Sequence, residues 1–239
     1  MNYETFEKGS LVHALVLVGS VALVALAVTI HRGTRAKSVA KADSIRTIAG
    51  VAILLFQIVH NSYWLLFRAG GFNMQDSLPL HFCDISGLVA AAALIYPDRR
   101  LVTILYFWGV GLSSTAFIIP VVTEGPAYLV FWTFWLSHLI IVGGAVFFVL
   151  AEGYRPGVRD LLLALAVTTA YVLLLLALNV AAGTNYGYVG KESEPTAFLG
   201  QWPFPRLPLL FLGGAMLETA AWMPFGIMAW QRTRRATRP

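Results

Sequence analysis

The sequence predicts an all-α, polytopic membrane protein with seven transmembrane helices. Of its 239 residues, 58% are hydrophobic and only 12% are charged, whereas a soluble domain carries about 25% charged residues. The apolar residues gather into seven runs, each near the roughly 20 residues that a helix needs to cross a bilayer. Lys and Arg fall mainly between these runs, as expected for a multi-pass chain.

The first three runs have distinct features. The run at about 9–30 has its positive charges after the apolar stretch, so we interpret it as a retained span and not as a cleavable signal peptide. The run at about 45–67 places polar residues on one stripe of a helix, and a polar stripe in a membrane helix has to face inward. The run at about 78–96 opens with polar residues and continues with apolar ones from Gly87.

The last four runs complete a single seven-helix domain that covers residues 1–239. Most connections are short, which predicts antiparallel neighbouring helices. The last run packs small residues, Gly213 to Ala215, beside Glu218, and small residues let a neighbouring backbone approach closely. The four runs lie at about 101–121, 127–150, 159–182 and 206–230.

The basic residues predict the orientation. With the N-terminus outside, the connections on the inner side hold most of the Lys and Arg, and the basic tail from Arg232 to Arg238 is also inside. We therefore expect a multi-pass protein of the cell membrane with its C-terminus in the cytoplasm. No nucleic-acid-binding module is present, and a single Cys excludes an intrachain disulfide.

One outer connection, residues 183–205, is long and rich in Gly, Pro, Tyr and Trp. Connections of this length are often lids or binding loops, and they also occur as aromatic belts at the membrane surface. Four of its residues are candidate substrate-binding groups: Asn185, Tyr186, Tyr188 and Trp202.

The polar start of the third run is the strongest functional signal. His81, Cys83 and Asp84 lie within about 5 to 10 Å of the outer boundary of the membrane, and ionisable groups in a membrane span are functional candidates by default. His81 and Asp84 share a helix face, whereas Cys83 is turned about 100° from Asp84.

The other polar side chains lie between the membrane midplane and the outer surface. His138 and Glu218 lie near the midplane, and His60, Asn61 and Asn179 lie in the outer half. This distribution predicts a cavity that opens outward. The plain alternative is that these groups only make hydrogen bonds or acid–histidine pairs between helices, and Cys83 can equally be a small buried hydrophobe.

Several sequence motifs occur in a fixed order along the chain: Leu78 to Ile85, Thr123 to Gly125, Phe131 to His138, Glu152 to Pro156, Asn179 with Gly183 to Tyr188, and Gly200 to Pro203. Together they resemble the YwaF-like family of bacterial integral membrane proteins, over about residues 45 to 228. The sequence departs from the family pattern at Phe82 and at 191–195. That family is similar to a eukaryotic polytopic membrane family that acts as a phospholipid acyltransferase through an intramembrane cysteine and histidine. The resemblance implies that Cys83 is the nucleophile and His138 its base.

The first functional hypothesis is therefore a lipid acyltransferase without a cofactor, with membrane lipids as its partners. In it a Cys83 thiolate forms a thioester and a histidine carries the proton; His81 faces away from Cys83, so His138 or His60 is the better base. Asp84 or Glu218 would orient that histidine. Asn179, Asn185 or backbone amides of the outer loop would hold the oxyanion.

A second hypothesis is a transporter or a small-ligand binding protein, in which the same His, Asp and Glu side chains relay protons or hold a cation. Paired repeats with broken helices, which typify alternating access, are not evident. Metal binding by His81, Cys83, Asp84 and His138 is a third possibility, but no zinc-site spacing is present.

Overall fold

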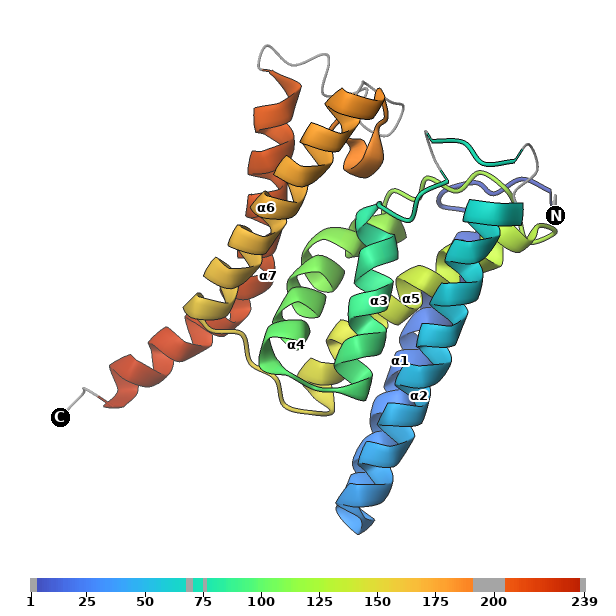
Figure 1. The fold of residues 1–239 in the computed structure, drawn as a ribbon. Coiled ribbons are helices and arrows are strands. Elements are labelled where there is room, and N and C mark those ends of the chain that lie inside the picture. Colours follow the sequence, from blue (N-terminus) through green and yellow to red (C-terminus); the bar gives the residue numbers. More distant parts are fainter. Residues whose placement is uncertain (1–3, 68–70, 75–76, 191–204, 237–239) are drawn as a thin grey trace.

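The computed structural model describes residues 4–67, 71–74, 77–190 and 205–236. This part of the chain is helical, apart from connections and one isolated β-bridge between Thr5 and Glu124. Its elements, shown in Figure 1, are α1 (Leu11–Lys37), α2 (Val39–Ser62), η1 (Tyr63–Phe67), α3 (Phe82–Ile95), α4 (Arg99–Tyr106), η2 (Phe107–Leu112), η3 (Ser113–Phe117), α5 (Leu129–Leu150), α6 (Val158–Ala182), η4 (Tyr186–Tyr188) and α7 (Arg206–Ala236).

Each of the seven predicted runs corresponds to a helical segment, and in the described residues five of these segments are long and apolar enough to cross a membrane. The five are α1, α2 continued into η1, α5, α6 and α7. The third segment, α3, has 14 residues. The fourth is a succession of α4, η2 and η3 without a gap.

The link between the first two runs is shorter than the sequence suggested. Residues 31–44 were expected to connect the spans, but only Ser38 interrupts the helix, with φ −158° and ψ 112°. Its backbone N–H donates to Thr34 O, and its side chain accepts from Lys41 N. Ser38 therefore ends one helix and caps the next, which the hydropathy pattern does not reveal because the flanking residues are polar.

Three groups of helices make up the molecule. Figure 1 shows α3, α4 and α5 in the middle, with α1 and α2 on one side and α6 and α7 on the other. The central helices pack through small residues, since Ala90 and Ala93 of α3 are fully buried against Leu105 and Ile141. Large apolar side chains on the outer faces are exposed, Val180 by 78% for example, as expected of surfaces that meet lipid.

The fourth segment changes from α- to π-helix at Phe107, where two glycines permit close packing. A Cβ at Gly109 would lie 2.9 Å from the carbonyl oxygen of Ile141 in α5, and one at Gly111 would lie 3.4 Å from Cα of Glu218 in α7. π-Helical turns are frequent at functional sites. This one lies against α5 and α7, two of the helices that border the cavity described next.

Candidate functional site

The N-terminus of α3 holds three of the predicted site residues. His81 is its N-cap, and its backbone N–H donates to Asp84 Oδ2 over 3.0 Å. The other carboxylate oxygen, Oδ1, lies 3.8 Å from Sγ of Cys83, which is the donor. Asp84 thus caps its own helix and contacts the thiol, and is not placed as the partner of a histidine ring that the sequence suggested.

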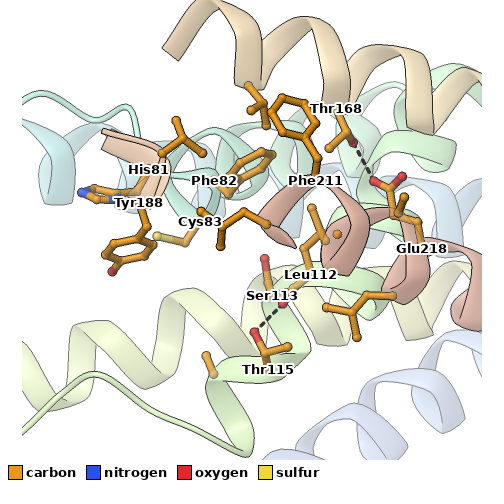
Figure 2. Close-up of a pocket in the computed structure, with 18 of the residues that line it drawn as sticks. His81, Phe82, Cys83, Leu112, Ser113, Thr115, Thr168, Tyr188, Phe211 and Glu218 are labelled. Atoms are coloured by element: carbon orange, nitrogen blue, oxygen red, sulfur yellow. Dashed lines mark hydrogen bonds between the residues drawn. The ribbon is translucent and has the colours of Figure 1, made fainter. Parts of the chain in front are cut away.

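Cys83 lines an apolar cavity of about 480 Å³, within the range of small-molecule sites. It lies between α3, α5, α6, α7, the η2–η3 segment and the η4 turn. Figure 2 shows His81, Cys83 and Tyr188 at one end, and Thr168 and Glu218 at the other. We call this space the apolar cavity.

His138 also lines the apolar cavity, and its hydrogen bond defines its tautomer. Nδ1 lies 2.8 Å from the carbonyl oxygen of Phe134, one turn earlier in α5. A carbonyl can only accept, so Nδ1 carries the proton, and in a neutral ring Nε2 is then left with its lone pair. The residue is 7% exposed.

The η4 turn places Tyr188 at the end of the apolar cavity where His81 and Cys83 lie (Figure 2). Tyr188 has a positive φ of 60°, which is uncommon for a non-glycine residue. Its carbonyl accepts from the guanidinium of Arg206 at the start of α7. Burial, followed by the neighbouring Cys83 and Asp84, raises the pKa of Tyr188 to about 12, so its phenol stays a hydrogen-bond donor at neutral pH.

Three other residues expected to bind substrate hold this turn together. The side chain of buried Asn179 donates to Tyr186 O at 2.9 Å and accepts from Tyr186 N and Thr184 Oγ1. Tyr186 donates its hydroxyl to Met74 O. Asn185 Oδ1 accepts from Gly190 N. None of the three lines the apolar cavity, and Trp202, the fourth candidate from this loop, lies outside the described residues.

Glu218 lies at the far end of the apolar cavity, fully buried. Trp108 Nε1 donates to Thr168 Oγ1 over 2.8 Å, and Thr168 in turn donates to Glu218 Oε1 over 2.6 Å. The indole can only donate, so the direction of this relay is fixed. Glu218 Oε2 has no hydrogen-bond partner among the described residues.

A second, smaller space lies on the other side of His81 and Phe134, which line both. It has a volume of about 210 Å³ and is bordered by His60 and Asn61 of α2 and by Asp84. We call it the polar pocket after these three side chains, although much of its remaining lining is apolar, from Trp64, Leu78, Pro79, Val130 and Phe134. It also contains Ser77 and Thr133.

Sequence reasoning missed Phe134, Thr168 and Trp108. An aromatic run in α5 and a Thr in α6 are ordinary features of a membrane helix, and only their contacts make them part of the site. Among the described residues, no group of three or more His, Cys, Asp or Glu side chains could hold a metal ion.

These features define the class: an all-helical, multi-pass membrane protein with an apolar cavity that carries polar groups at both ends. The chain belongs to the TMEM164 family, whose family model matches residues 9–219. No curated protein and no solved structure matches the chain.

Proposed function

We propose that the protein is a membrane-embedded lipid acyltransferase that uses Cys83 as nucleophile and His138 as base. The observation that carries the proposal is that both side chains line one apolar cavity, where Nε2 of His138 has a lone pair to offer. An apolar cavity suits an acyl chain, and a thiol beside an imidazole is the pair needed for covalent catalysis.

The first half of the reaction forms a thioester. His138 Nε2 takes the proton of the Cys83 thiol, the thiolate attacks the ester carbonyl of a phospholipid, and a C–S bond replaces the C–O bond. The proton then passes from His138 to the alkoxide of the departing lysolipid. Cys83 lies in the first turn of α3, partly buried and beside the Asp84 carboxylate, so it needs a base such as His138 to become the nucleophile. Tyr188, which lines the same cavity as Cys83, donates to the carbonyl oxygen as negative charge develops on it.

The proposal includes a topology. All seven helical segments cross the bilayer of the cell membrane, the N-terminus is outside and the C-terminus is in the cytoplasm. The concentration of Lys and Arg on the inner side supports it. The N-terminal end of α1 lies at the same end of the molecule as the start of α3 and the η4 turn, which agrees with a cavity that opens outward (Figure 1).

An assay of lipid exchange tests the proposal. Purified protein in vesicles is given a phospholipid with an isotopically labelled acyl chain and an unlabelled lysolipid, and lipid mass spectrometry follows the label. We expect transfer by the wild type, and its near loss in Cys83→Ser and His138→Ala. Transfer that persists in Cys83→Ser would show that Cys83 is not the nucleophile.

Transport of a small ligand is the second candidate, and the buried Glu218 with its unpartnered Oε2 is the observation that favours it. An intramembrane carboxyl of this kind can carry a proton. The same two variants separate the candidates, because a transporter should keep most of its flux when Cys83 becomes Ser.

A further inference from the structure

The apolar cavity and the polar pocket meet at the N-terminus of α3. His81 and Phe134 line both spaces, Cys83 lines only the first, and Asp84 lines only the second. The two reactive side chains are adjacent in sequence, with Sγ and Oδ1 3.8 Å apart. A group bound in the polar pocket can therefore contact Asp84, the residue whose carboxylate touches the sulfur, without having to enter the apolar cavity.

The polar pocket has the chemistry of a hydroxyl site. Its described lining offers an amide at Asn61, an imidazole at His60 and a carboxyl at Asp84, but no Lys or Arg. Phosphate recognition generally uses Arg or Lys, so a neutral hydroxyl group suits this pocket better than a phosphate. At about 210 Å³ it is less than half the size of the apolar cavity.

Acylation of Cys83 would change the role of Asp84. In the structure, Asp84 Oδ2 accepts from the His81 backbone, and Oδ1 has the thiol as its donor. A thioester sulfur carries no proton, so once Cys83 is acylated, Oδ1 loses that donor. The carboxylate then becomes free to accept a hydrogen bond from another hydroxyl at the same position.

The geometry points to the polar pocket as the acceptor site, where a lipid hydroxyl resolves the thioester with Asp84 as its base. This inference rests on the proposed function. The hydroxyl proton goes to Asp84 Oδ1, the oxygen attacks the thioester carbonyl, and a C–O bond forms as the C–S bond breaks. Asp84 then returns the proton to the thiolate, which restores the Sγ–H to Oδ1 contact seen in the structure. Donor and acceptor thus bind in two different spaces, one lined by Cys83 and the other by Asp84.

The test measures the two half-reactions separately, with intact-protein mass spectrometry. Labelled phospholipid alone gives the rate at which Cys83 is acylated, and later addition of lysolipid gives the rate at which the acyl group leaves. Val130→Phe fills the polar pocket, which Val130 lines. The matched control is Leu129→Phe, its neighbour in α5, which is 68% exposed and lines neither space.

We expect Val130→Phe to acylate at the wild-type rate and to release the acyl group at least about 10-fold more slowly, while Leu129→Phe matches the wild type in both steps. Asp84→Asn should accumulate acyl-enzyme with release slowed about 100-fold, the usual contribution of a general base. If either variant fails to fold, Asn61→Leu, a smaller change in the same pocket, takes its place, and it should also release the acyl group more slowly than the wild type.

The outcomes separate the two proposals. If wild-type Cys83 becomes acylated but release is unchanged in Val130→Phe and Asn61→Leu, the acceptor enters through the apolar cavity and the polar-pocket inference is wrong. If wild-type Cys83 is never acylated, the acyltransferase proposal itself fails. Ala215→Phe, which fills the apolar cavity from α7, should slow acylation, whereas Ala220→Phe on the same helix, outside the cavity, should not.

Discussion

Tyr188 combines an uncommon backbone conformation with a place beside Cys83 at one end of the apolar cavity. Its φ of 60° is maintained by surrounding hydrogen bonds, and strained residues of this kind cluster at functional sites. If its phenol donates to the developing oxyanion, Tyr188→Phe should slow acylation of Cys83 by about 100-fold and leave thermal stability unchanged. Tyr128→Phe, outside both spaces, is the control. If Cys83 is acylated at the same rate in both variants, Tyr188 has no role in the mechanism.

Asn179 shows the opposite case, a polar membrane residue with a structural role. Its side chain makes three hydrogen bonds to Thr184 and Tyr186, and it is 3% exposed. Asn179→Ala should lower the free energy of unfolding by about 3 kcal/mol, because buried partners are left unsatisfied. Asn185→Ala should cost about 1 kcal/mol, since it loses a single bond to Gly190. Unfolding by denaturant in detergent measures both, and equal losses would contradict this account.

At the residue scale, sequence reasoning could select candidates but could not assign their uses. Depth in the membrane identified His138 and Glu218, and both line the cavity. Helix geometry predicted that Cys83 is turned about 100° from Asp84, and the two side chains are still in contact because the carboxylate turns back to cap the helix. Asn179 and Tyr186 are polar in the same way as the cavity residues, and only their hydrogen bonds distinguish them.

The contact between α2 and α3 depends on a glycine. A Cβ at Gly50 would lie 2.9 Å from the backbone nitrogen of Ile95 and 2.9 Å from Cβ of Leu94. Gly50→Ala should therefore force these helices apart and lower the free energy of unfolding by about 1 to 3 kcal/mol. Gly33→Ala in α1, where nothing lies within 4 Å, should be neutral or stabilising because Ala favours helix. Tolerance of Gly50→Ala in the same unfolding assay would contradict the tight packing.

The helical segments were easier to predict from the sequence than the breaks and π-helical turns within them. Runs of apolar residues located each helical segment, since hydrophobic length is a strong signal in membrane proteins. The π-helical turn at Phe107–Leu112 and the single-residue break at Ser38 leave no comparable signal. Both depend on local hydrogen bonds, and the π-helical turn also depends on the close packing of glycines.

An ionic cluster around Glu152 joins three helices of the molecule. Glu152, after α5, lies 2.9 Å from His31 of α1 and 3.4 Å from Arg46 of α2, and it also contacts Arg35. Glu152→Ala leaves the buried Arg46 without this partner, so we expect a loss of about 3 kcal/mol in unfolding free energy. Asp43→Ala removes more exposed pairs and should cost less than about 1 kcal/mol. Similar losses in the two variants would show that the cluster contributes little.

The topology can be tested in a Cys83→Ser background, because the chain then contains no cysteine. Phe72→Cys and Tyr96→Cys introduce exposed sites at opposite ends of the molecule. With the N-terminus outside, a membrane-impermeant maleimide should label the first in intact cells and the second only after lysis. The reverse pattern would invert the orientation and place the cavity mouth on the cytoplasmic side.

The nucleophilic role of Cys83 is the central claim, and the chemical state of this residue tests it most directly. Protein extracted gently from its native membrane is analysed by intact and peptide mass spectrometry, before and after neutral hydroxylamine. The account predicts an acyl adduct on Cys83 that hydroxylamine removes and that is absent from His138→Ala. A Cys83 that is unmodified, and that stays so when phospholipid is supplied, would contradict the account and leave the thiol as part of the helix packing.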